Sequence, residues 1–288
     1  MPRVLIAGCG YVGAATADLF HAANWDVEGW TRSRESAAQL AQKRYSVRPV
    51  DLASPNEVKP AAREFDVIIH CASSGGGGVE TYRRTYHEGV QNLLALLHPP
   101  VFIFTSSTSV YAQTTGEWVD EESAAEPAHE TGRILRETEE FVRQKGGMIA
   151  RLAGIYGPGR SALLRKFLSG EARIEGNGGR FINQVHRHDI ATALFLLAQL
   201  PNEQRTGNLI FNVVDNQPIT QRACYAWLAA RLGRPIPPTT ITATERKRGA
   251  SNKRVSNAKL RRLHWTPRFP TFESGMEHSV LSGASGWL

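Results

Sequence analysis

Three glycines near the start of the chain have the spacing of a phosphate-binding turn. Gly8, Gly10 and Gly13 read G-x-G-x-x-G, directly after the apolar run 4–7 and directly before a helical pattern. The first glycine allows a tight turn, the second lets the backbone approach a pyrophosphate, and the third lets the helix pack closely on the strand. The free N–H groups of the helix N-terminus favour an anion. The predicted cofactor-binding residues of this turn are Gly8, Gly10, Tyr11, Val12 and Gly13.

The residues after the second expected strand indicate which dinucleotide binds. An NAD site usually places a carboxylate at this strand end, on the ribose 2′-hydroxyl. Glu28 lies inside the strand instead, and the strand end reads Thr31-Arg32-Ser33. Hydroxyl and guanidinium groups can hold a 2′-phosphate, which a carboxylate would repel. NADP(H) is therefore favoured; NAD(H) stays an alternative, because Arg32 could equally begin a solvated helix.

Small or acidic residues follow the third and fourth expected strands. Asp51 and Leu52 follow the third, where a carboxylate could accept a hydrogen bond from the adenine amino group. Cys71, Ala72 and Ser73 follow the fourth, where small side chains leave room for the adenosine ribose. An aspartate at a strand end is often only a helix cap, but successive strand ends meet at one edge of a parallel sheet. We therefore include all five residues in the predicted cofactor site.

Strand-like and helix-like segments alternate through the first half of the chain. Continuous apolar runs, as at 101–104, are typical of strands buried on both faces. This alternation predicts an α/β fold, a Rossmann-type doubly wound parallel sheet with its ligand at the carboxyl ends of the strands. We expect strands at 4–7, 26–30, 45–50, 67–71, 101–105 and 148–152, and helices at 11–23, 34–43, 80–97 and 129–145.

After residue 153 the pattern loosens into glycine-rich loops and shorter elements. We therefore expect a dinucleotide-binding Rossmann core at 1–153, completed by segments near 183–215. A smaller C-terminal substrate-binding lobe would comprise 154–182 and 216–288. The later elements are expected as helices at 161–169, 189–200 and 220–232 and a strand at 209–213.

The composition is that of an ordinary soluble protein. Of 288 residues, 41% are hydrophobic and 21% charged, and no apolar run approaches the roughly 20 residues that span a bilayer. We expect a cytoplasmic protein without a membrane partner. The three cysteines lie far apart without metal-ligand spacing, so neither a metal site nor a disulfide is expected. Basic residues at 245–253 and 259–262 lack interleaved aromatics or a nucleic-acid motif; we expect solvated faces or a basic rim for an anionic ligand.

Several later segments resemble the extended, epimerase/dehydratase-like branch of the short-chain dehydrogenase/reductase superfamily. The stretch 102–111 (FIFTSSTSVY) is similar to its SSxxVYG segment, and 151–160 (RLAGIYGPGR) is similar to its RxxxxYGPG loop. The stretch 183–191 (NQVHRHDIA) resembles its NxIHxxDxA segment. The resemblance covers nearly the whole chain and implies a small-molecule substrate and a homodimer. It also implies cofactor contact by Gly154 and substrate contacts by Tyr156, Arg160, Asn183 and His186.

The chain departs from this family at the proton relay. The family uses Tyr-x-x-x-Lys, in which the phenol exchanges a proton with the substrate oxygen and the lysine lowers the phenol's pKa. Aligning 129–137 (HETGRILRE) on its glycine puts Thr131 at the tyrosine and Leu135 at the lysine. Ser107 aligns with the catalytic hydroxyl, whereas Tyr86 stands where the family has an asparagine. The short G-x-G-x-x-G turn also differs from the usual G-x-x-G-x-x-G, so the chain resembles the atypical subgroups.

Two functions stay open at this level. The first is an NAD(P)-dependent oxidoreductase or epimerase/dehydratase-like enzyme acting on a sugar nucleotide or a small carbonyl or alcohol. Its candidate catalytic residues are Ser107, Tyr86 and His129. For His129, an exposed or hydrogen-bonded side chain without a catalytic role is favoured. The second is a catalytically silent NADP(H)-binding sensor or scaffold, because the proton relay is missing.

Overall fold

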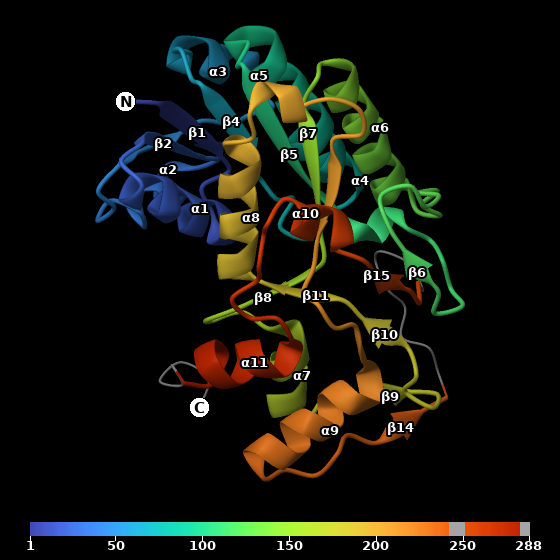
Figure 1. Ribbon diagram of the computed structural model, residues 1–288. Helices are drawn as coiled ribbons and strands as arrows, with labels where there is room; N and C mark the ends of the chain where they lie inside the picture. The colour runs from blue at the N-terminus through green and yellow to red at the C-terminus, as the bar shows by residue number, and fades with distance from the viewer. Residues whose placement is uncertain (242–250, 283–288) are drawn as a thin grey trace.

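The computed structural model describes residues 1–241 and 251–282, and its centre is a seven-stranded parallel sheet (Figure 1). The strands are β1 (Arg3–Ala7), β2 (Asp26–Thr31), β3 (Ser46–Pro49), β4 (Val67–His70), β5 (Val101–Ser107), β7 (Met148–Leu152) and β12 (Ile210–Val213). Their spatial order is β12-β7-β5-β4-β1-β2-β3. The chain reverses its direction of travel across the sheet between β1 and β4, so their carboxyl ends form the topological switch point. The predicted Rossmann-type fold is confirmed.

Helices cover both faces of this sheet. They are α1 (Tyr11–Ala22), α2 (Arg34–Ala38), α3 (Pro55–Ala61), α4 (Val79–Tyr82), α5 (Gly89–Leu97), α6 (Glu130–Gln144) and α8 (Arg187–Ala198). Helices α1 and α8 pack against each other on one face, and α5 and α6 lie over the other (Figure 1). No helix within the described residues is long and apolar enough to cross a membrane.

Two expected helices differ in extent from the prediction. The helix expected at 34–43 ends at Ala38, and none of its residues is buried, so no apolar face packs to extend it. The helix expected at 80–97 consists of α4, a π-helical segment at Arg83–Glu88, and α5. A π-helical turn widens the helix locally and is often found at functional sites.

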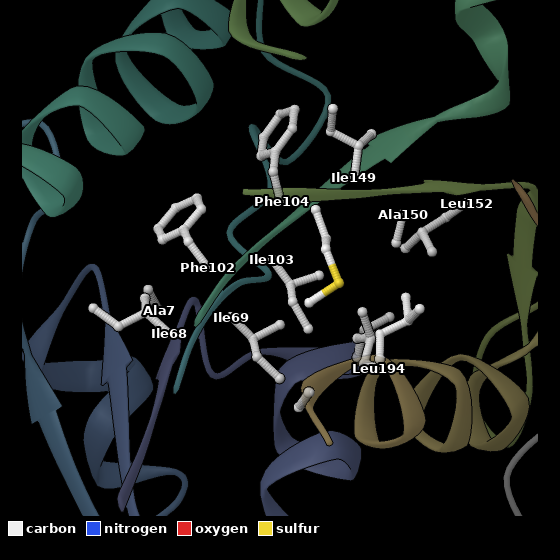
Figure 2. Close-up of a cluster of buried hydrophobic side chains, with 14 of the residues drawn as sticks. Ala7, Ile68, Ile69, Phe102, Ile103, Phe104, Ile149, Ala150, Leu152 and Leu194 are labelled. Carbon is white, nitrogen blue, oxygen red and sulfur yellow. The ribbon is translucent and has the colours of Figure 1, made fainter. Parts of the chain in front are cut away.

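The core lies between the central strands and the helices. Figure 2 shows Ile69 of β4 and Ile103 of β5 pointing toward Leu194 of α8, whereas Ile149 of β7 points to the opposite face of the sheet, beside Phe104. All five side chains are fully buried. Strands covered on both faces require this unbroken apolar character, which explains why the sequence predicts β4 and β5 so clearly.

One buried ion pair fixes the helix α6 to the sheet beside Ser107. Arg151 of β7 donates through Nε and Nη2 to Glu139 of α6, at 3.0 and 2.7 Å. Ser106 Oγ donates to the same carboxylate at 2.6 Å, and Arg151 Nη1 donates to the Tyr111 hydroxyl at 2.8 Å. Both charged side chains are at most 2% exposed. Because every partner is hydrogen-bonded, this network holds the end of β5 in one geometry.

A second hydrophobic cluster forms the smaller lobe. It is built mainly from α7 (Ala162–Leu168), α9 (Gln221–Leu232) and α11 (Phe272–Gly275), which Figure 1 shows below the sheet. The chain does not divide as simply as expected, because Val255, Leu260 and Trp265 pack into the first core rather than into this lobe. Residues 245–250 of the expected basic stretch lie outside the described residues.

The remaining elements are short. They are α10 (Ala258–Arg262), the 3-10 turns Thr108–Val110 and Asn202–Gln204, the π-helical turn Met276–Val280, and the strand pairs β8 (Gly154–Tyr156) with β11 (Gln184–His186), β10 (Phe181–Ile182) with β13 (Ile219–Thr220), β9 (Ile174–Glu175) with β14 (Thr239–Thr240), and β6 (Trp118–Val119) with β15 (Arg254–Val255).

Candidate cofactor and substrate cleft

The glycine turn connects β1 to α1 with little room except on one side. Gly8 has φ +102°, and a Cβ there would lie 2.1 Å from the backbone nitrogen of Ala72. A Cβ on Gly13 would lie 2.2 Å from the Gly8 carbonyl oxygen. A Cβ on Gly10, in contrast, meets no atom within 4 Å. The fold thus requires Gly8 and Gly13, while Gly10 leaves open space at the N-terminus of α1, where no side chain caps the helix. This turn fits a pyrophosphate.

A continuous cleft of about 1320 Å³ begins at this turn. One arm reaches the end of β2, and the other passes β5 and β7 into the second lobe. The volume exceeds that of an ordinary small-molecule pocket and suits a dinucleotide with a second ligand. The predicted site residues that line it are Gly8, Gly10, Tyr11, Val12, Thr31, Arg32, Ser33, Asp51, Leu52, Cys71, Ala72, Ser73, Tyr86, Ser107, Gly154, Arg160 and Asn183.

The end of β2 offers hydroxyl and guanidinium groups to this cleft. Arg32 is exposed there, and Ser33 caps α2 by accepting a hydrogen bond from Ser36 N–H at 3.2 Å. Glu28 is 3% exposed and does not line the cleft. Its carboxylate accepts from Trp30 Nε1 at 2.7 Å and pairs with Arg48 at 3.2 Å. The Glu28 carboxylate therefore pairs with Trp30 and Arg48 and is not available to the ribose of NAD.

Asp51 combines a local structural role with its place in the cleft. Its Oδ1 accepts from Ala53 N–H at 3.0 Å, and its Oδ2 pairs with Arg84 at 3.2 Å. The first contact is a local turn interaction of the kind that aspartates commonly make at strand ends. The carboxylate is half-buried and borders the cleft, where contact with adenine stays a prediction.

The other arm of the cleft carries the residues expected at the reacting centre. Ser107 ends β5, and its Oγ accepts from Ser109 N–H at 3.1 Å at the start of a 3-10 turn. Tyr86 comes from the π-helical segment and packs against His70 and Phe104. Leu135 lines the cleft where the related proteins are expected to have lysine. An apolar side chain therefore occupies the position of the absent charge.

Three residues expected to act on or contact the substrate do not line the cleft. His129 is exposed at the N-terminus of α6, outside the lining. Tyr156 is fully buried, and its hydroxyl donates to the Thr271 carbonyl oxygen at 3.3 Å. His186 lies 3.0 Å from Ser279 Oγ, and burial lowers its pKa to about 4, so it is neutral at physiological pH. The expectation that Tyr156 and His186 contact substrate is wrong for this geometry: both tie the C-terminal segment to the fold.

The ring of Tyr11, in the glycine turn, lies close to two arginines. The guanidinium of Arg160 is 5.1 Å from the ring centroid and that of Arg187 is 4.5 Å from it. The Tyr11 hydroxyl donates to the Pro158 carbonyl oxygen at 3.0 Å. The loop that carries Arg160 is thereby held against Tyr11 of the glycine turn, which places this arginine beside the predicted pyrophosphate site.

The sequence profile of the NAD dependent epimerase/dehydratase family matches residues 4–213. The chain belongs to this family. Protein YeeZ of Escherichia coli K12 is 31% identical over 242 residues, which cover 81% of this chain and 85% of YeeZ. A solved structure from Methylobacillus flagellatus, described as a candidate NAD-dependent epimerase/dehydratase, is 26% identical with a TM-score of 0.79 over 98% of each chain. The UDP-glucose 4-epimerase of Thermus thermophilus, solved with NAD, shares the fold at 19% identity and a TM-score of 0.78 over 96% of each chain.

Two positively charged side chains in the cleft of this family member were not predicted from the sequence. Arg180 and Lys253 line the cleft beside Asn183, which donates to the Lys253 carbonyl oxygen at 2.9 Å. Burial lowers the pKa of Arg180, and its Nε has no hydrogen-bond partner among the described residues. Lys253 belongs to the basic stretch that was interpreted as solvated. A lysine in a stretch rich in basic residues carries no local signal that it is buried, so only the tertiary structure identifies it.

Proposed function

We propose that this epimerase/dehydratase family member is an NADP(H)-dependent enzyme that transfers hydride to or from a carbonyl or alcohol carbon. The observation that carries the proposal is the single cleft joining the glycine turn, Ser107 and the second lobe. A silent cofactor sensor would not need the arm that extends past Ser107. Sugar nucleotides are the first substrate class to test, because MoeE5, a protein with a similar fold, was solved in complex with UDP-glucose and NAD.

Different groups of cleft residues suit different parts of the cofactor and the substrate. When bound, the nicotinamide would supply or accept the hydride. The backbone at Gly10 and the N-terminus of α1 would hold the pyrophosphate, and Thr31, Arg32 and Ser33 would hold a 2′-phosphate. The hydroxyl of Ser107 would donate a hydrogen bond to the substrate oxygen and thereby orient it.

Arg32→Asp should reduce the preference for NADPH over NADH by at least ~10-fold, because a carboxylate repels a 2′-phosphate. Fluorescence titration with each cofactor measures the two affinities. Arg34→Asp is the matched control, since Arg34 is exposed near the same strand end but does not line the cleft. An equal loss of affinity for NADPH and NADH in Arg32→Asp would contradict the assignment of the 2′-phosphate site.

Ser107→Ala should lower kcat by about 100-fold, the usual effect of removing one hydrogen bond to a reacting oxygen. Turnover of UDP-glucose, UDP-galactose and UDP-glucuronic acid, with added NADP⁺ or NAD⁺, can be followed by chromatography and by reduced-cofactor absorbance. Ser109→Ala, in the same turn and also lining the cleft, should stay close to wild type. Full activity of Ser107→Ala would remove this hydroxyl from the reaction.

A further inference from the structure

Lys253 is a buried lysine that faces the reacting arm of the cleft. The residue is 5% exposed and lines the cleft, as do Ser107 and Leu135. Its Nζ donates to the Tyr111 carbonyl oxygen at 2.8 Å and to Ser251 Oγ at 2.8 Å. Tyr111 ends the short turn that begins after Ser107. The ammonium group is thus attached to the same turn that presents the candidate catalytic hydroxyl.

Within the part of the chain that the structure describes, no ion pair balances the charge of this ammonium. Among residues 1–241 and 251–282, no carboxylate lies within 4.0 Å of Lys253 Nζ, whereas the buried Arg151 pairs closely with Glu139. An ammonium has three N–H donors, and the contacts with Tyr111 and Ser251 use two of them. A buried ammonium with only uncharged partners among the described residues is costly, so its presence beside a cleft indicates a functional role.

The surroundings of Lys253 lower its pKa toward neutral pH. Burial, together with the positive charge of Arg180, lowers the pKa of Lys253 to about 8, and the more distant carboxylate of Glu117 opposes that change. A group with a pKa near the working pH can both give and take a proton, which is the property that acid–base catalysis needs. The two groups that accept its hydrogen bonds, the Tyr111 carbonyl and the Ser251 hydroxyl, are uncharged.

We propose that Lys253 is the group that exchanges a proton with the substrate oxygen, in place of the absent tyrosine and lysine pair. The proposal deepens the proposed function and rests on it. In the reducing direction, a bound reduced nicotinamide would supply hydride to the carbonyl carbon, and the electron pair of the C=O bond would move to oxygen. That oxygen takes a proton from the Lys253 ammonium, which leaves an alcohol, the oxidised nicotinamide and a neutral amine. One proton taken up from the solvent restores the ammonium, and oxidation runs the same steps in reverse, releasing that proton.

The direction of the pH dependence follows from this role. Reduction needs the ammonium form, so its rate should fall as the pH rises through the pKa of about 8. Oxidation needs the neutral amine, so its rate should rise over the same interval. Lys253→Arg should lose both activities, because arginine keeps the charge but does not release a proton near neutral pH.

The closing experiment measures the lysine itself. The chain has seven lysines, so protein labelled with ¹³Cε-lysine gives few NMR resonances, and the Lys253→Met spectrum identifies the one of interest. Methionine has similar length and no charge, so the variant should fold. We expect Lys253 to titrate near pH 8 rather than at its ordinary 10.5. Its midpoint should be lower by at least about 0.5 in the NADP⁺ complex than in the NADPH complex, because only the oxidised nicotinamide ring is positively charged.

The controls distinguish a failure of the role of Lys253 from a failure of the proposed nicotinamide-dependent function. Lys259 is half-buried but outside the cleft, so its titration should be the same in both complexes, and Lys259→Met should keep wild-type activity. Lys253→Met and Lys253→Arg should bind NADPH within about twofold of wild type. Failure of either nicotinamide cofactor to bind wild type would overturn the proposed function. Binding with identical Lys253 midpoints in the two complexes, a free-protein midpoint near 10.5, or an active Lys253→Arg would overturn the role of Lys253 alone.

Discussion

Gly10→Val should weaken the binding of a nicotinamide cofactor by at least ~1,000-fold, or about 4 kcal/mol, while the protein stays folded. Gly10 has φ −98°, which any residue adopts, and a Cβ there meets no atom within 4 Å. The fold therefore accepts a side chain at this position. The valine would nevertheless fill the space at the N-terminus of α1 that the pyrophosphate needs.

The chain offers a close control for this substitution. Gly78 is also the residue before a helix, has φ −75°, and has no atom within 4 Å of its Cβ position. It does not line the cleft. Gly78→Val therefore places the same β-branched side chain before a helix but outside the cleft, and should bind cofactor as wild type does. Wild-type affinity in Gly10→Val, measured by fluorescence titration, would place the pyrophosphate elsewhere.

Arg151→Met should lower the free energy of unfolding by about 3 to 5 kcal/mol, because it leaves the carboxylate of Glu139 buried without its main partner. Arg136 contacts the same carboxylate but is 30% exposed, so it compensates only in part. Urea denaturation measures the change. Arg143→Met breaks the exposed pair with Glu140 and should cost at most about 1 kcal/mol.

A double variant tests whether the buried charge is the cause. Arg151→Met combined with Glu139→Gln removes both charges, so the two substitutions should be clearly less damaging together than the sum of their separate effects. Strict additivity would mean that Arg151 acts through packing rather than through the ion pair. The comparison bears on function, because this network fixes the end of β5 beside Ser107.

The strands of the parallel sheet and the glycine turn could be predicted because their causes are local. An unbroken apolar run such as the one in β5 requires burial on both faces, and the turn at Gly8 requires a positive φ. The length of α2 could not be predicted, since it depends on whether an apolar face finds a partner. The π-helical segment Arg83–Glu88 has no local signature that would distinguish it from an α-helix.

Part of the candidate site could be predicted from the sequence, and part of it could not. The cofactor residues follow from strand ends, which a parallel sheet brings to one edge, and those expected from Gly8 to Ser73 line the cleft, except Gly13, which packs helix on strand. The substrate residues depend on how the second lobe folds back. Tyr156 and His186 therefore turned out to be structural, whereas Lys253 reaches the cleft through contacts with residues distant in sequence.

The measurement that tests this account most directly is fluorescence titration of the wild-type protein with NADPH and, separately, with NADH. The account predicts that NADPH binds at least ~10-fold more tightly than NADH, because Arg32 and its neighbours receive the 2′-phosphate. Binding of neither cofactor would contradict the central claim that the cleft at the glycine turn is a nicotinamide dinucleotide site.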